Sequence, residues 1–140
     1  MEAIGILRPA IVLVGWTGVM LAWLLATRLP ALSKAGIEPQ QAQDTSRLRD
    51  LLPAEAQRVA NNYNHLFEQP TLFYALVAMI AILGDVDSLH VQCAWAFTVL
   101  RIIHSCVQAT VDIVAIRFGV FLLSWIALGI MIVREVMAVF

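Results

Sequence analysis

The sequence predicts an all-α integral membrane protein, folded as an up-down bundle of four helices. Hydrophobic residues make up 61% of its 140 residues, charged residues make up 14%, and the mean hydropathy is +0.82. An average soluble domain has roughly 45–50% apolar and about 25% charged residues, and a domain of this size cannot hide such an excess of apolar surface from water. The composition excludes a disordered chain. The net charge of −1, with nine Lys and Arg, excludes a free nucleic-acid-binding protein.

The first predicted helix begins at Pro9, which suits the first turn of a helix, and no charge interrupts it before Arg28. A cleaved signal peptide is the alternative, but this uncharged stretch is long for one. Residues 29–55 contain three prolines and most of the charge outside the helices. They predict a polar loop, with a short helical turn around Thr45–Leu52.

The second helix is predicted to run without a break from Ala54 to Gly84. Only short connections separate it from the third helix and the third from the fourth, so we expect these helices to be antiparallel neighbours. A spanning helix needs about 20 mostly apolar residues. The predicted spans of this single domain, 1–140, are about 9–28, 56–83, 88–110 and 113–139.

Basic residues predict the orientation, because Lys and Arg are enriched in cytoplasmic loops. Residues 28–58 contain five of the nine Lys and Arg, whereas the turn between the second and third helices contains only Asp85 and Asp87. We therefore expect loop 29–55 to be cytoplasmic and both termini to lie outside the cytoplasm.

Polar residues recur along one face of the second and third predicted helices. At 100° per residue, each set covers about 120° of arc. Such residues cannot face hydrocarbon, so they must face each other, a second subunit or a wet cavity. Hydrogen bonding between helices is the purely structural alternative. Convergence of so many ionisable groups favours a cavity for a polar ligand. The sets are Arg58, Asn61, Asn64, His65 and Glu68, and Thr98, Arg101, His104, Ser105, Gln108 and Asp112.

Glu68 and Arg101 are predicted to lie at the same depth. A rise of 1.5 Å per residue places them about 24 Å and about 20 Å from the outer ends of their helices. We therefore expect an ion pair between them that organises the cavity.

These residues resemble a known family, the membrane-associated proteins in eicosanoid and glutathione metabolism (MAPEG). The resemblance rests on the runs Arg101-Ile-Ile-His104-Ser105 and Glu68-Gln-Pro70-Thr-Leu-Phe73-Tyr74, followed by Arg117. It covers about residues 54–134, and the first helix by hydropathy only. Microsomal glutathione transferase and microsomal prostaglandin E synthase belong to this family. The expected protein is a bacterial member in the inner membrane.

The resemblance implies a homotrimer in the lipid bilayer that binds glutathione between neighbouring protomers, near the cytoplasmic face. It implies that Arg117 is catalytic and polarises the glutathione thiol, and that a lipophilic small molecule is the second substrate. The implied glutathione-binding residues are Arg28, Asn61, Asn64, His65, Glu68, Arg101, His104 and Gln108. No metal site is expected, because Cys93 and Cys106 lack the paired spacing of a zinc site and are expected to be free thiols.

Three functions stay open. The first is a glutathione-dependent transferase or peroxidase that acts on lipophilic electrophiles. The second is a non-catalytic relative, either a lipid-binding scaffold or an accessory subunit of a larger membrane complex. It is favoured because Asn61 and His65 stand where the family has Arg and Asn, and Gln108 replaces a tyrosine. The third is haem binding, with His65 and His104 as axial ligands.

The predicted orientation can be tested with reporter fusions. A reporter inserted between Ser33 and Asp50 is expected to behave as cytoplasmic, and one inserted at Asp85 as external, because Lys and Arg are concentrated in residues 28–58. The reverse pattern of reporter activity would place the polar residues in the outer leaflet.

Overall fold

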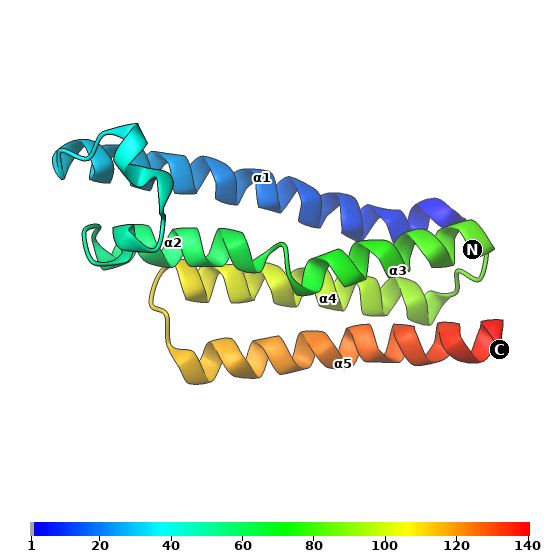
Figure 1. Ribbon diagram of the computed structural model, residues 1–140. Helices are drawn as coiled ribbons and strands as arrows, with labels where there is room; N and C mark the ends of the chain where they lie inside the picture. The colour runs from blue at the N-terminus through cyan, green and yellow to red at the C-terminus, as the bar shows by residue number, and fades with distance from the viewer. Residues whose placement is uncertain (1) are drawn as a thin grey trace.

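The computed structural model describes residues 2–140 and shows helices lying side by side as an up-down bundle (Figure 1). The all-α four-helix architecture predicted from the sequence is confirmed. Helix α4 packs most extensively against α5, and α1 packs against α2, α3 and α4. The elements are α1 (Ala3–Lys34), η1 (Pro39–Gln43), η2 (Arg47–Arg49), α2 (Ala54–His65), α3 (Gln69–Leu83), α4 (Ser88–Ala109) and α5 (Val114–Val139).

The second predicted helix is divided into α2 and α3, which continue one another along the bundle (Figure 1). Pro70 occupies the first turn of α3. Proline has no amide N–H and its ring clashes with the carbonyl four residues earlier, which favours a kink or a break at this point, and here the helix breaks. The chain instead makes short-range hydrogen bonds across 66–68, including Phe67 N to Asn64 O at 3.1 Å. Together the two helices still form one 30-residue candidate span, Ala54–Leu83.

Three candidate spans are long and apolar enough to cross a membrane: Ala3–Lys34, Ala54–Leu83 and Val114–Val139. Helix α4 has 22 residues, about 33 Å at the helical rise, but its apolar character is diluted by Arg101, His104 and Gln108. All three of these side chains are buried. The chain is therefore an integral membrane protein whose most polar helix turns its polar face inward.

Both termini lie at one end of the bundle, here called the terminal end, and residues 35–53 lie at the opposite loop end (Figure 1). Helix α1 is longer than predicted at both ends, so Pro9 lies inside the helix and not in its first turn. The carbonyl of Pro9 accepts a hydrogen bond from Thr98 Oγ1 at 3.0 Å, which joins α1 to α4. In the loop, η2 forms the short turn expected within Thr45–Leu52.

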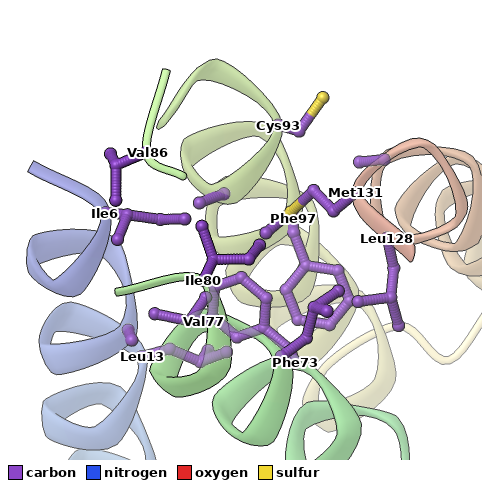
Figure 2. Packing of buried hydrophobic residues seen from close by; sticks show 14 residues of the cluster. Ile6, Leu13, Phe73, Val77, Ile80, Val86, Cys93, Phe97, Leu128 and Met131 are labelled. Atoms are coloured by element: carbon purple, nitrogen blue, oxygen red, sulfur yellow. The ribbon is translucent and has the colours of Figure 1, made fainter. Parts of the chain in front are cut away.

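The apolar core fills the terminal half of the bundle, where α1, α3, α4 and α5 all contribute side chains (Figure 2). Phe73 of α3 and Phe97 of α4 stack at its centre, with ring centroids 4.3 Å apart. Ile6 of α1 and Leu128 of α5 are fully buried beside them. A smaller apolar cluster between α1 and α2 lies toward the loop end. As expected, Cys93 and Cys106 are free thiols.

The α3–α4 turn is held by its glycine and by Asp87. Gly84 ends α3 with a φ of +84°, a conformation that residues with a Cβ rarely adopt. Asp87 caps α4 by accepting the N–H of His90 at 2.8 Å, and it pairs with Arg134 of α5. This cap holds the pKa of Asp87 below its ordinary value, chiefly through the backbone hydrogen bond from His90.

Replacing Asp87 with Ala is expected to lower the free energy of unfolding by about 1 kcal/mol at neutral pH, the usual cost of losing a helix cap. Because the folded-state pKa is lowered, the cap contributes stability above the ordinary aspartate pKa, and the contribution is lost as pH falls through the folded value. Thermal unfolding in detergent should therefore separate wild type from Asp87→Ala at pH 7, and the gap should shrink as the pH falls below the ordinary pKa of aspartate. A gap that stays constant as the pH falls would contradict this role.

Candidate functional site

A polar layer crosses the bundle at the level of the break between α2 and α3. Its centre is Arg101, whose residue surface is 0% exposed. Arg101 Nη1 donates to Gln69 Oε1 at 3.2 Å, and Nη2 donates to the carbonyl of His65 at 3.5 Å. Ser124 Oγ of α5 lies 3.0 Å from the same Gln69 oxygen. One amide oxygen therefore links α3, α4 and α5.

The guanidinium of Arg101 lies where α2 ends. The last carbonyls of a helix lack intrahelical partners and carry partial negative charge. The carbonyl of His65 lies at this end and also accepts the N–H of Glu68 at 3.3 Å, and the end of α2 favours a cation at this position. Arg101 is thus bound by a helix end and an amide, without a carboxylate in hydrogen-bond contact, and its Nε has no hydrogen-bond partner among the described residues.

The expected ion pair between Glu68 and Arg101 is not among the contacts of the described residues. Glu68 Oε2 instead accepts from Nδ1 of His65 at 2.7 Å, and its side chain is 66% exposed. The cause is the break at 66–68, which changes the helical phase. It turns Gln69 toward Arg101 and Glu68 toward the outside.

A cavity of about 180 Å³ opens beside this layer, toward the loop end. The imidazole rings of His65 and His104 lie in contact there, with centroids 5.0 Å apart, and Phe121 lies against both. His104 is buried, and its Nδ1 has no hydrogen-bond partner among the described residues. The lining is completed by Arg117 and by Val114 and Phe118 of α5.

The two histidines do not fit the haem interpretation. A haem with two axial histidines lies between their rings and separates them, whereas these rings touch. The same two imidazoles fit a site that binds a small polar ligand, with one side cationic through Arg117 and the other aromatic.

Arg117 is positioned by the connection between α4 and α5. Asp112 has a φ of +49°, in the left-handed region that aspartate tolerates better than most residues. Its backbone N–H closes the end of α4 by donating to the carbonyl of Val107 at 2.8 Å. Its carboxylate accepts Nη1 of Arg117 at 2.5 Å. One residue thus ends α4 and holds the guanidinium at the rim of the cavity.

The remaining predicted site residues do not line this cavity. Asn61 and Asn64 are exposed on α2, and Arg28 is half-buried on α1. Gln108 is buried on α4, and its side-chain oxygen has no partner among residues 2–140. A single chain therefore brings together His65, His104 and Arg117, with Arg101 and Glu68 adjoining them through His65, and leaves the other four apart.

Three residues of the site, Gln69, Ser124 and Phe121, were not predicted from the sequence. The residue Gln69 directly precedes Pro70, and this pair was the available signal, because a proline inside a predicted span indicates a break whose ends carry polar contacts. A serine and a phenylalanine in an apolar helix offered no comparable signal.

Gln69 is expected to stabilise the fold by supplying Arg101 with an acceptor. Losing a hydrogen bond to a charged group costs about 1.5–3 kcal/mol, so Gln69→Leu and Arg101→Met should each lower the unfolding temperature in detergent. The double mutant should recover part of this loss, because it leaves neither a buried charge short of an acceptor nor an amide without its donor.

Glu68→Gln is the matched control. Its side chain is exposed, so it should destabilise the protein much less than Gln69→Leu. Additive losses in the Gln69→Leu and Arg101→Met double mutant would show that the two side chains act independently.

Comparison with known proteins supplies the family. No curated protein and no solved structure matches this chain. The model of the MAPEG family matches residues 6–137, which is almost the whole chain and extends from α1 to α5. The chain therefore belongs to the MAPEG family.

Proposed function

We propose that this protein is a glutathione-dependent transferase or peroxidase that acts on lipophilic electrophiles within the membrane. The observation that carries the proposal is the cavity at the loop end, where Arg117, His65 and His104 converge. MAPEG membership supports glutathione as the co-substrate, because this family is generally associated with glutathione.

In this proposal Arg117 activates the thiol of glutathione. A free thiol has a pKa near 8.5 and is mostly protonated at neutral pH, and an adjacent cation favours the thiolate. The thiol proton passes to water at the cavity mouth. The sulfur lone pair then forms the C–S bond with the electrophilic carbon, and the leaving group departs with the electrons of the broken bond. In the peroxidase reaction the thiolate attacks a peroxide oxygen, and the O–O bond breaks with its electrons leaving on an alkoxide, which takes a proton from water. A second glutathione then reduces the sulfenic acid that has formed, which gives glutathione disulfide and water.

The neighbouring protomer completes the site in this proposal. A cavity of about 180 Å³ is smaller than the roughly 300–1,000 Å³ typical of ligand pockets. Asn61, Asn64 and Glu68 are exposed within a candidate span, and polar side chains in a span do not face hydrocarbon. A homotrimer covers them and adds their polar atoms, together with Arg28, to the glutathione site.

The proposed orientation places this site on the cytoplasmic side of a bacterial inner membrane. The loop end carries the basic residues that favour the cytoplasm, and both termini lie at the opposite end of the bundle (Figure 1).

A non-catalytic, lipid-binding role is the second candidate. The observation that favours it is the ion pair between Arg117 and Asp112, since a guanidinium already engaged by a carboxylate is a weaker electrostatic partner for a thiolate. A protein of this kind would act as a scaffold or as an accessory subunit in a larger membrane complex.

Arg117→Ala is expected to abolish glutathione conjugation or peroxidase turnover while the tripeptide still binds, because its cation acts on the thiol and several other groups hold the peptide. Calorimetry on the detergent-purified protein measures binding, and thiolate absorbance together with turnover measures activation. Arg49→Ala, a change of the same charge in the exposed loop, is the control and should alter neither. Absence of glutathione binding to the wild type would favour the non-catalytic candidate.

A further inference from the structure

A second cavity lies at the terminal end, far along the bundle from the Arg117 site. It has a volume of about 420 Å³ and is a groove between α3 and α5. Its walls are apolar side chains of α3 and of the end of α5, with Phe140 beyond it: Leu72, Ala75, Leu76, Met79, Leu83, Ile132, Val136 and Val139. Glu135 is the one ionisable residue that lines it.

Glu135 forms no ion pair or side-chain hydrogen bond in the described part of the chain. The residue is only 6% exposed, and neither carboxyl oxygen has a hydrogen-bond partner among residues 2–140. Burial of a carboxyl group without a partner is costly, above all in a membrane helix, where such residues mark functional sites. The neighbouring Arg134 is already paired with Asp87 in the α3–α4 turn. Residues 2–140 therefore leave this carboxylate free to bind a cationic group that enters the groove.

The surroundings of Glu135 favour a cation. It lies in the last turns of α5, which ends at Val139, and the C-terminus of a helix carries partial negative charge and free carbonyl groups. A primary ammonium group offers three donors and the opposite charge. The carboxylate of Glu135 and the nearby end of α5 therefore both favour the binding of an ammonium group at the membrane edge.

The size and walls of the groove favour a single alkyl chain. A volume of about 420 Å³ falls in the range of roughly 300–1,000 Å³ of small-molecule sites. A helix of a second copy, about 10 Å across with its side chains, does not enter a groove of this size. The apolar wall extends from Glu135 along α3 toward the bilayer centre, as the hydrocarbon tail of an amphiphile requires.

We propose that the groove between α3 and α5 binds a single-chain lipophilic primary amine, with the ammonium on Glu135 and the alkyl chain along Leu72–Leu83. This site is separate from the glutathione site and does not depend on the function proposed there.

The test uses the full-length protein in phosphatidylcholine nanodiscs and a dodecylamine probe that carries a photoreactive diazirine in its chain. Mass spectrometry of the labelled protein should locate adducts within 69–83 and 131–140. Unlabelled dodecylamine should compete with the probe, and dodecanol, which has the same chain without the charge, should not. Equal competition by the alcohol would show ordinary partitioning into an apolar surface and would overturn the proposal.

Glu135→Gln should reduce labelling about tenfold or more, the effect of losing a charge-assisted hydrogen bond. Glu2→Gln, which removes the same charge from an exposed position at the same end, is the matched control and should label as wild type does. Met79→Trp, which keeps the carboxylate and fills the groove, should also reduce labelling and serves if Glu135→Gln does not fold.

Two results identify a different occupant and overturn the proposal. Unchanged labelling of Glu135→Gln with an altered oligomeric mass would assign the carboxylate to a contact with a second copy of the chain. Displacement of the probe by phosphatidylethanolamine added to the nanodisc would assign the site to the headgroup of a two-chain lipid.

Discussion

The burial of Arg101 is the constraint on which the arrangement of the other helices depends. A guanidinium has five N–H donors and cannot lose its charge, so inside a membrane bundle it needs acceptors that a regular helix does not offer. A continuous second helix would have used its carbonyls internally. The break before Pro70 releases the carbonyl of His65 from the helical pattern, so that it accepts from Glu68 N and from Nη2 of Arg101, and it places Gln69 at the start of α3. Ser124 then binds the same amide oxygen and ties α5 to the layer.

The apolar core and the polar cavity lie in different halves of the bundle. The stacked rings of Phe73 and Phe97 and the apolar cluster around them fill the terminal half (Figure 2), and burial of such surface is the main source of stability. The break and the polar layer lie next to this apolar cluster, so the ends of α2 and α3 are held by packing on one side. The cavity with Arg117 opens on the other side, where a polar ligand can enter without displacing the apolar core.

Composition and residue periodicity predicted the helices, because hydrophobic length in a membrane chain depends little on tertiary contacts. The prediction that Glu68 faces Arg101 was wrong, because a helix face calculated at 100° per residue assumes one unbroken helix. The break before α3 changes the direction in which the following side chains point, so Gln69 and not Glu68 faces inward. Arg117 was found through family resemblance. Its carboxylate partner Asp112 was predicted to lie on the polar face of the third helix. The left-handed turn that orients this side chain could not be predicted from residue spacing alone.

Glu68 and Glu135, two carboxyl groups of the spanning segments, illustrate how a membrane chain can leave part of a site unfilled. Glu68 is exposed and bound to a histidine, so in the proposed homotrimer it can turn toward a neighbouring protomer and its ligand without loss of the core. Glu135 is enclosed by apolar walls and has no hydrogen-bond partner in residues 2–140, so a cationic group that enters the groove would find an unpaired acceptor there. The first arrangement suits the proposed site shared between protomers, and the second suits the proposed amine drawn from the bilayer. The two proposals therefore give one small bundle two ligand environments of opposite character, a cavity beside a guanidinium at one end and a groove beside a carboxylate at the other.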